Sequence, residues 1–263
     1  MSRHRHRPRH DRQRPGGAAG GTLALYGIHA VEAALLNPRR AIQRLLVTDN
    51  AAERLAKAIA SRGIAAIAAE PKDIDRELPA GSVHQGALAT VLPLDVPALA
   101  DLAPGEANGP DPILIVLDQV TDPHNAGAIL RTAAAFGAAG LVMTDRNSPP
   151  LASALAKAAS GGLEHVPVVQ VTNLARALEE LAELGFFRIG LDGAAADALE
   201  TGDLNGPTAL ILGAEDSGMR RLTRESCDRL ARLATMGPIR SLNVSNAAAI
   251  ALHTVRLVRS LRG

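Results

Sequence analysis

Asp122-Pro-His-Asn-Ala-Gly-Ala-Ile-Leu-Arg131 follows an apolar run at residues 113–117 and leads into a helical pattern. Two more polar stretches interrupt the Ala-, Leu- and Val-rich second half of the chain. They are Gly213-Ala-Glu-Asp-Ser-Gly218, after the apolar run 209–212, and Ser241-Leu-Asn-Val-Ser-Asn246, at the start of a long helical pattern. All three therefore lie where a strand and a helix meet. Because ligands bind at the carboxyl ends of the strands in open α/β sheets, we expect the three stretches to form one site.

The chain from residue 113 onward alternates short apolar runs with helical patterns. The pattern predicts strands at 113–117, 141–144, 166–169, 187–191, 209–212 and 230–233. It predicts helices at 125–136, 151–159, 174–184, 220–228 and 244–261. Such alternation is typical of an α/β fold with a mostly parallel sheet flanked by helices on both faces.

The first part of the chain predicts a smaller α/β unit. Helices are expected at 26–35, 51–62 and, as a short turn, 71–77, and strands are expected at 44–48, 64–69 and 87–91. Five prolines and two glycines then fall between residues 93 and 112, which is typical of an interdomain linker. We therefore divide the chain into a tail at 1–21, a small domain at 22–92, a linker at 93–112 and a larger domain at 113–263.

The tail carries the positive charge of the chain. The 263 residues have a formal net charge of +1, and residues 1–17 hold six arginines against one acid, Asp11. The remainder has 22 basic and 26 acidic residues, a net charge of −4. With no apolar face to bury, the tail is predicted to be disordered and to tether a polyanion. A tail that serves solubility alone is the alternative. The arginines expected to contact the polyanion include Arg3, Arg5, Arg7 and Arg9.

Composition and cysteine content limit the cellular setting. The apolar runs are too short to span a membrane as helices of about 20 residues, and the N-terminus lacks the apolar core of a secretory signal. Cys227 is the only cysteine, which excludes an intrachain disulfide and a cysteine-based zinc cluster. We expect a cytoplasmic protein with no membrane partner and no metal.

Gly213 and Gly218 have the spacing of a phosphate-binding loop, but the chemistry of such a loop is absent. Met219 and Arg220 stand where it needs Lys and Ser or Thr, and the carboxylate of Glu215 would repel phosphates. No Gly-x-Gly-x-x-Gly stands between an expected strand and helix, which removes the dinucleotide fingerprint. What remains is a pocket of carboxylates, amides, hydroxyls and one arginine, which suits a neutral or cationic ligand.

Together the three polar stretches resemble the three motifs of the SpoU (TrmH-like) family, the S-adenosylmethionine-dependent RNA ribose 2′-O-methyltransferases of the SPOUT class. The resemblance runs from Ile113 to the C-terminus in order and spacing. Tyr26-Gly-Ile-His-Ala-Val-Glu-Ala-Ala-Leu35 and His84-Gln85-Gly86 look like the small ribosomal-protein-like substrate-binding domain of some members. This layout is more similar to members that methylate a guanosine of 23S rRNA than to single-domain tRNA members.

The resemblance implies a fold, a cofactor and partners. The larger domain would thread its C-terminal segment through a loop as a deep trefoil knot, although knots are rare in proteins. The cofactor would be S-adenosyl-L-methionine, and the partner would be RNA, with 23S rRNA expected. A homodimer would form through the C-terminal domain. The helical pattern at 244–261 agrees with this because it is apolar on more than one face.

The resemblance also implies residue roles toward the RNA. In the family pattern Arg131 activates the ribose hydroxyl, with a role as base. Because a guanidinium stays charged, we favour Arg131 as a clamp on the adjacent phosphate that lowers the pKa of the hydroxyl. Asn125 can both donate and accept, so it can hold a ribose or an arginine in register. His84 and Gln85 are expected to shape a turn in the small domain and to contact RNA.

The remaining motif residues are expected to face the cofactor. Glu215 would favour the sulfonium or fix its own loop through amide hydrogen bonds. Ser241 and Asn243 would bridge the ribose and the loop backbone, and the alternative is that Ser241 or Ser245 caps the last helix. The expected catalytic residues are Arg131, Asn125, Glu215, Ser241 and Asn243. The expected cofactor-binding residues are Gly213, Glu215, Leu233, Thr235, Gly237, Leu242 and Asn243.

Three other functions share these sequence features. They are a tRNA 2′-O-methyltransferase, a thiostrepton-resistance-type rRNA methyltransferase, and a non-catalytic RNA-binding ribosome-assembly factor with the same fold. The chain has only one tyrosine and three phenylalanines, so an aromatic platform that stacks on bases is not expected. RNA would be held by charge and shape.

Overall fold

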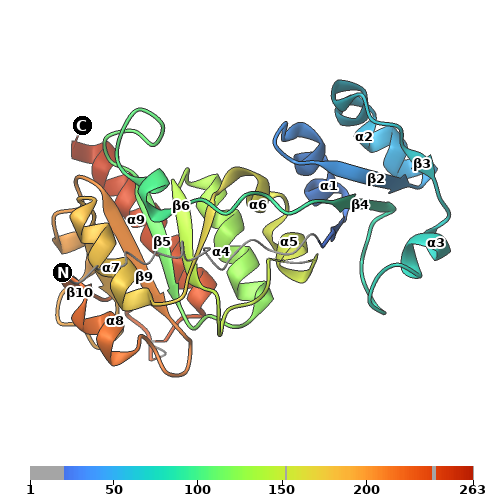
Figure 1. Cartoon of the computed structure of the whole chain (residues 1–263). Coiled ribbons are helices and arrows are strands. Elements are labelled where there is room, and N and C mark those ends of the chain that lie inside the picture. The colour runs from blue at the N-terminus through green and yellow to red at the C-terminus, as the bar shows by residue number, and fades with distance from the viewer. Residues whose placement is uncertain (1–20, 152, 239–240, 263) are drawn as a thin grey trace, which may run out of the picture.

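The computed structural model describes residues 21–151, 153–238 and 241–262. Two sheets divide these residues, a four-stranded sheet in the first part of the chain and a six-stranded sheet in the second (Figure 1). The arginines of the predicted tail, among them Arg3, Arg5, Arg7 and Arg9, lie outside the described residues. Within the described ranges, no helix is both long enough and apolar enough to cross a membrane.

The small sheet has the strand order β1-β4-β2-β3. Its strands are β1 (Leu23–Tyr26), β2 (Ile42–Val47), β3 (Ile67–Ala68) and β4 (Ala87–Val91). Its helices are α1 (Ile28–Leu36), α2 (Asp49–Arg62) and α3 (Pro71–Asp75). Strand β4 is antiparallel to β1 and β2, whereas β2 and β3 are parallel. The apolar sides of α1 and α2 are buried in one cluster with this sheet, which makes the first part of the chain an α/β unit.

The sequence pattern missed strand β1. It predicted a helix from residue 26, whereas Tyr26 ends an edge strand and the helix begins at Ile28. Gly27 separates the two elements with a φ of 90°, a conformation that glycine adopts without steric cost. A strand of four residues is too short for its alternation to be told from the apolar start of a helix. The predicted end of the next helix is confirmed, because Gly63 caps α2 in the left-handed conformation.

The large sheet has the strand order β10-β8-β9-β5-β6-β7, and all its neighbouring strands are parallel. Its strands are β5 (Ile113–Asp118), β6 (Gly140–Thr144), β7 (Val168–Val171), β8 (Phe187–Leu191), β9 (Thr208–Gly213) and β10 (Arg229–Ala231). The helices are α4 (Pro123–Ala135), α5 (Ser153–Ala159), α6 (Gly162–His165), α7 (Leu174–Glu183), α8 (Arg221–Glu225) and α9 (Val244–Arg262). The predicted α/β fold with a mostly parallel sheet flanked by helices is therefore confirmed.

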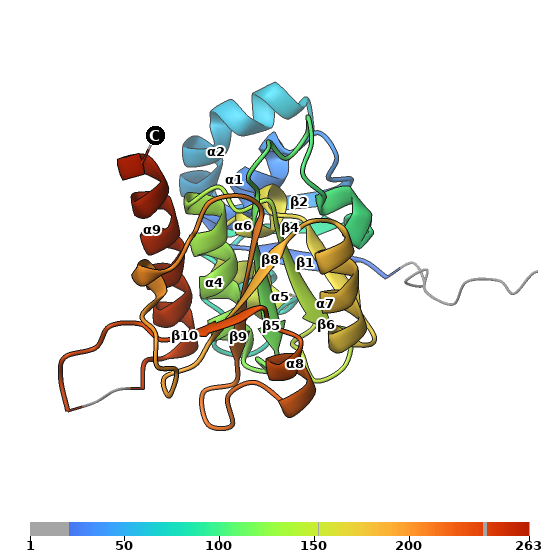
Figure 2. The same cartoon turned by 90° about the vertical axis from the view of Figure 1, so that its left-hand side faces the viewer.

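Strand β5 shows how the large sheet is buried on both faces. Ile113, Ile115 and Leu117 belong to one apolar cluster, together with side chains of α4 and α9. Leu114 and Val116 point the other way, into a second cluster with α7. Figure 2 shows α4 and α9 on one side of the strands and α7 on the other. Burial of each such side chain stabilises the fold by about 1.5–3 kcal/mol, so the central strand fixes where its polar end lies.

Part of the predicted linker packs on the large sheet. A 3-10 helix, η1 (Leu99–Leu102), lies within residues 93–112, and Leu99 and Leu102 are both buried in the cluster on the α7 face. A Cβ at Gly140 would come within 2.7 Å of the Leu102 side chain, so that glycine leaves room for the leucine. Some of the segment between the two sheets is therefore anchored rather than free.

Candidate functional site

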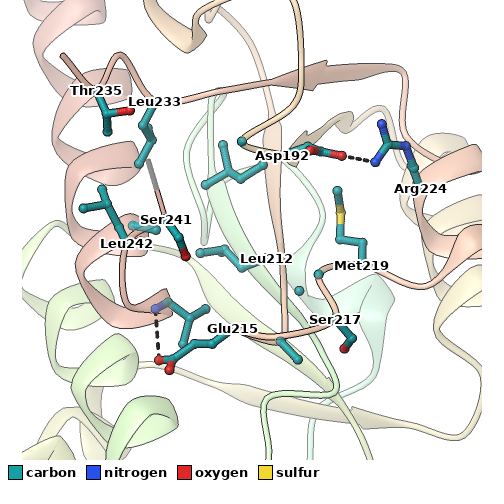
Figure 3. Close-up of a pocket in the computed structure, with 17 residues that line it drawn as sticks. Asp192, Leu212, Glu215, Ser217, Met219, Arg224, Leu233, Thr235, Ser241 and Leu242 are labelled. Atoms are coloured by element: carbon teal, nitrogen blue, oxygen red, sulfur yellow. Dashed lines mark hydrogen bonds and ion pairs between the residues drawn. The ribbon is translucent and has the colours of Figure 1, made fainter. Parts of the chain in front are cut away.

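A cavity of about 410 Å³ opens where β8 and β9 end. Its walls come from the loop after β9, from the chain that follows β10, and from the segment that enters α9. Figure 3 shows Leu233 and Leu242 on one side of the cavity, with Asp192 and Arg224 on the opposite side. The site thus lies at the carboxyl edge of the parallel sheet, where ligands bind in open α/β folds.

Most of the expected cofactor residues line this cavity. Those that do are Gly213, Glu215, Leu233, Thr235 and Leu242, and Ser241 lines it with them. Gly237 and Asn243 are not among the lining residues. Asn243 instead reaches the site through the side chain of Glu215.

Glu215 lies at the centre of a hydrogen-bonded cluster. Its Oε1 accepts from Asn125 Nδ2 at 2.9 Å and also from Asn243 Nδ2. The same Asn243 Nδ2 donates to Asn125 Oδ1 at 3.0 Å, and the backbone N–H of Val244 donates to Glu215 at 3.3 Å. These residues come from the loop after β9, the first turn of α4 and the start of α9. The three polar stretches therefore converge, as their pattern predicts.

The surroundings of Glu215 leave its charge available. Its donors are amides of the side chains and the backbone, and no cation of the described residues forms an ion pair with it. The side chain is exposed at the cavity. A carboxylate that is held by dipoles and not neutralised attracts a cationic ligand.

Asn243 has a second contact that settles how α9 begins. Its Oδ1 accepts from the backbone N–H of Ser245 at 2.9 Å and from the Ser245 hydroxyl at 2.6 Å. This is the geometry of an N-cap residue. Asn243, and not Ser241 or Ser245 as in the alternative, thus caps this helix, which fixes the Asn243 side chain between the helix and Glu215.

The loop after β9 takes its shape from a glycine and a buried carboxylate. A Cβ at Gly213 would come within 2.1 Å of the Gly218 carbonyl carbon, so the loop closes only around glycine. Asp118 ends β5 and is fully buried, and it accepts from the Arg220 backbone N–H at 2.8 Å and from its Nε at 2.7 Å. Sequence reasoning missed this pair, although an acid that directly ends an apolar strand at the ligand edge was a signal.

A second charged pair forms part of the cavity wall. Asp192 follows β8, and its carboxylate binds the guanidinium of Arg224 from α8 (Figure 3). Sequence reasoning assigned no role to either residue. Because the two charges compensate each other, Glu215 stays the uncompensated carboxylate of the described cavity wall.

Arg131 lies apart from the Glu215 cluster. It follows Asn125 by six residues on α4, which turns the two side chains about 120° apart around the helix. The Arg131 side chain is exposed, and its Nη1 lies 3.4 Å from Ser160 Oγ. Both polar atoms of the Asn125 amide are used by Glu215 and Asn243. In this structure Asn125 therefore orders the Glu215 side of the site and does not hold the arginine.

His84 and Gln85 make contacts within the protein. His84 Nδ1 accepts from the Gly86 backbone N–H at 3.0 Å, and its Nε2 lies 3.2 Å from Asp75 Oδ1. Gln85 Oε1 accepts from the first N–H of α1, at Ile28, at 3.1 Å, and from Lys157 Nζ of α5 at 3.4 Å. The two residues shape a turn, and Gln85 also connects α1 of the small unit with α5 of the large one.

Cys227 and the arrangement of possible metal ligands can be described for the residues of the structure. Burial raises the pKa of the Cys227 thiol to about 11, so it stays protonated at neutral pH. No group of three or more His, Cys, Asp and Glu side chains among the described residues is arranged to hold a metal ion.

The described fold and site define a class of protein. Residues 112–253 match the SpoU rRNA Methylase family, and residues 24–97 match a family described as RNA 2′-O ribose methyltransferase substrate binding. The first match spans more than half of the chain. The chain therefore belongs to the SpoU rRNA methylase family, and the resemblance of the three polar stretches is confirmed.

Curated relatives narrow the comparison to one kind of member. The 23S rRNA (guanosine-2′-O-)-methyltransferase RlmB of Pseudomonas syringae pv. tomato is 42% identical over 244 residues, which cover 90% of this chain and 96% of the relative. The RlmB protein of Shewanella oneidensis is 41% identical, with 90% and 98% covered. The chain is thus similar to RlmB proteins over nearly their whole length.

Solved structures share the fold at lower identity. The SpoU methyltransferase AviRb of Streptomyces viridochromogenes, in complex with the cofactor AdoMet, has a TM-score of 0.75 at 23% identity and covers 92% of this chain and 91% of its own. An AdoMet-bound rRNA methyltransferase of Sinorhizobium meliloti has a TM-score of 0.74 at 23% identity, with 90% and 87% covered. Each match covers 90% or more of this chain, so the likeness in fold extends well beyond the large sheet.

Proposed function

We propose that this protein transfers a methyl group from S-adenosyl-L-methionine to the ribose 2′-hydroxyl of a guanosine in 23S rRNA. The observation that carries the proposal is the cavity beside Glu215, which joins all three family motifs at one sheet edge. The similarity to RlmB proteins over 90% of the chain supports the choice of substrate. Ribosomal RNA is made in the cytoplasm of bacteria, and we place the protein there.

The cavity fits S-adenosylmethionine in size and chemistry. Its volume of about 410 Å³ is typical of small-molecule sites, which span roughly 300–1,000 Å³. Leu212, Leu233 and Leu242 offer apolar surface to an adenine, and Glu215 offers negative charge to a sulfonium. When bound, the cofactor supplies an electrophilic methyl group. Gly213, Thr235 and the neighbouring backbone would hold it by hydrogen bonds and shape, and we place Gly237 and Asn243 just behind them.

Arg131 is the residue that we assign to the ribose. A ribose hydroxyl is a poor nucleophile near neutral pH and must be made easier to deprotonate. A guanidinium has five N–H donors, and within the described residues only Ser160 accepts from that of Arg131. The remaining donors are free to bind the phosphate next to the ribose. The fixed positive charge then lowers the pKa of the hydroxyl and stabilises the oxyanion as it forms.

The Glu215 cluster supplies the second half of the mechanism. Asn125 and Asn243 hold the carboxylate in one orientation, and Ser241 adds a hydroxyl at the cavity wall. Good orientation of two reactants contributes about 7–11 kcal/mol to lowering a barrier. Positioning by these groups therefore supplies a large share of the rate.

We infer the trefoil knot from family membership and from the path of the chain. Strand β10 lies at one edge of the large sheet, yet α9, which follows it, returns to pack against β9 and α4 near the sheet centre. Residues of the loop 213–219 line the cavity together with Leu233 and Thr235 after β10 and with Ser241, Leu242 and Val244 at the start of α9. This return path is what threading of the C-terminal segment through the preceding loop requires.

The partners follow from the same reasoning. We assign RNA binding to the small unit, whose residues 24–97 match the substrate-binding family, and to the arginine-rich tail. His84 and Gln85 would act there by shaping the turn between α3 and β4. We also assign a homodimer to the large domain, because α9 exposes Ile250, Leu257 and Leu261. Sedimentation at micromolar concentration tests the dimer.

Methyl transfer to isolated RNA tests the function. The protein is incubated with labelled S-adenosylmethionine and either unmodified 23S rRNA or tRNA, and the methylated ribose is mapped. We expect one guanosine of 23S rRNA to be labelled. Methylation of tRNA alone would assign the tRNA activity, and methylation of a different rRNA nucleotide would assign the thiostrepton-resistance type. Binding of RNA without any transfer would point to an assembly factor.

A pair of arginine variants tests the residue assignment. We expect Arg131→Ala to lower the transfer rate roughly 100-fold or more while leaving S-adenosylmethionine affinity unchanged. The control is Arg176→Ala, an exposed arginine of α7 on the opposite face of the sheet. Near-normal transfer by Arg131→Ala would overturn the assignment.

A further inference from the structure

The small unit packs against the large one at a short segment, residues 160–164 with the sequence Ser-Gly-Gly-Leu-Glu. We call these five residues the seam segment. Its last residue, Glu164, accepts from Arg40 Nη2 at 2.6 Å and from Asn37 Nδ2 at 2.8 Å. The Arg40 and Glu164 side chains are 1% and 2% exposed. Arg40 and Asn37 belong to the small unit, so a fully buried ion pair fixes that unit to α6.

The glycines of the seam segment touch both sides of the junction. Gly161 has a φ of 93°, and a Cβ there would come within 2.6 Å of the Ala33 Cβ on α1. A Cβ on Gly162 would come within 2.9 Å of the Leu130 carbonyl oxygen and 3.1 Å of the Arg131 backbone nitrogen. One side of the segment therefore meets the small unit, and the other meets α4 at Arg131.

Ser160 links the seam segment to the arginine side chain. Its backbone has a φ of 48°, which holds the residue in a left-handed turn, and its hydroxyl accepts from Arg131 Nη1 at 3.4 Å. Within five residues the chain thus contacts the helix α1 of the small unit, the backbone of α4 and the guanidinium of Arg131. These contacts follow one another directly along the chain.

We propose that residues 160–164 are a positioning element that couples the seating of the small domain to the orientation of Arg131. The proposal rests on the ribose methylation proposed above. RNA held by the small domain is thereby presented to Arg131 in a fixed register. Because the junction contains a buried ion pair and glycine contacts, a shift of the small unit moves the α4 segment that carries Arg131. Misplacement of a reacting group by about 1 Å can lower a rate on the order of 100-fold.

A glycine variant with a matched control tests the coupling. Gly161→Ala places a Cβ against Ala33, whereas Gly185→Ala introduces the same kind of strain at a φ of 89° with no atom within 4 Å. Ala33→Gly in the Gly161→Ala background removes the opposing Cβ. We measure amide hydrogen exchange over α4 in all of these proteins without RNA. Exchange around Leu130 and Arg131 should rise in Gly161→Ala, stay normal in Gly185→Ala, and return toward normal in the double variant.

Turnover supplies the second measurement. We expect the kcat for rRNA methylation to fall about 100-fold in Gly161→Ala, with S-adenosylmethionine affinity unchanged, and to recover in the double variant. Ala33→Gly weakens a helix, so the double variant should melt lowest and yet work better than Gly161→Ala. A role in stability alone would give the reverse order. If Gly161→Ala does not fold, Ser160→Ala tests the coupling in its place. We expect its kcat to fall about fivefold because one hydrogen bond to Arg131 is lost.

The outcomes separate this proposal from the proposed function. A wild-type protein that methylates no RNA overturns the function, and the exchange measurement still decides the coupling. Normal exchange and normal kcat in Gly161→Ala overturn the coupling while leaving the function standing. A double variant as slow as Gly161→Ala overturns it as well.

Discussion

Two glutamates of this protein accept a hydrogen bond from an asparagine amide, yet their surroundings differ in every other respect. Glu164 is buried between the two sheets and is neutralised by Arg40. Glu215 is exposed at the cavity, and the described residues offer it amides but no cation. The comparison teaches that burial and charge compensation, not residue type, decide whether the charge of a carboxylate is used up within the fold or stays available at the surface.

The energetics of the two sites follow from this contrast. A buried ion pair contributes little over an apolar pair of the same shape, but loss of one partner leaves a bare charge in the interior. An exposed carboxylate costs little to change, and its charge is screened by water. Substitutions of Glu164 should therefore lower the stability of the protein, whereas substitutions of Glu215 should lower its activity.

The largest effect is expected for Glu164→Ala. Removal of the carboxylate leaves Arg40 buried and unpaired, and we expect the free energy of unfolding to fall by about 3–5 kcal/mol. Urea unfolding followed by circular dichroism measures the change. The control is Arg40→Met with Glu164→Leu, which removes both charges and should be clearly less destabilised than Glu164→Ala, because only the Asn37 amide and the Leu92 carbonyl lose a hydrogen-bond partner. If the double variant is as unstable as Glu164→Ala, charge burial is not the cause.

The next largest effect is expected for Glu215→Gln. The amide can still accept from Asn125 and Asn243 but has lost the charge, and charged hydrogen bonds contribute about 1.5–3 kcal/mol. We expect the methylation rate to fall on the order of 10- to 100-fold and the free energy of unfolding to change by less than about 0.5 kcal/mol. A variant with normal turnover and lowered stability would place Glu215 in the structural class of Glu164.

Asp228 provides a case of intermediate burial. Its hydrogen bond with Arg188 lowers the pKa of the carboxyl, and the two side chains are 29% and 15% exposed. The contribution to stability is present above the unfolded-state pKa of about 3.9 and is lost as the pH falls through the lower folded-state value. We expect Asp228→Asn to cost up to about 1 kcal/mol at pH 7 and less at pH 2. Urea unfolding at both pH values checks this, and an equal cost at pH 2 would contradict it.

The smallest effect is expected at the surface pair of Arg44 and Glu77, which are 45% and 36% exposed. Exposed pairs contribute about 0–1 kcal/mol, so Glu77→Gln should change the free energy of unfolding by less than about 0.5 kcal/mol. High salt should abolish what effect there is. If Glu77→Gln lowers the free energy of unfolding as much as Glu164→Ala does, the effect of a substitution does not depend on how deeply the pair is buried.

The sequence predicts the large sheet and its polar edge because these depend on local patterns. Alternating apolar runs and helical periods place strands and helices, and Asn125, Glu215 and Asn243 each follow from the position of their stretch. The convergence of these stretches could be predicted because all lie at strand–helix junctions. The family resemblance then supplied the cofactor and the RNA.

Pairs that are distant in sequence could not be predicted in the same way. Glu164 and Arg40 are separated by 124 residues, and Arg220 and Asp118 by 102 residues. Nothing local to either partner indicates the other, since both contacts arise only when separate elements pack. The partners of the Asn125 amide, Glu215 and Asn243, are likewise distant in sequence, whereas Arg131 on the same helix is not among them. Six residues on a helix turn the two side chains to different faces.

Calorimetric titration with S-adenosylmethionine tests whether the cavity beside Glu215 holds the methyl donor. Gly193 lines this cavity, and a Cβ there would meet no atom within 4 Å, so Gly193→Phe can fill the site. Gly105 is equally open but is not among the lining residues, and Gly105→Phe is the matched control. We expect saturable binding to the wild type and to Gly105→Phe and loss of binding in Gly193→Phe. Unchanged affinity in Gly193→Phe, or no binding to the wild type, would contradict it.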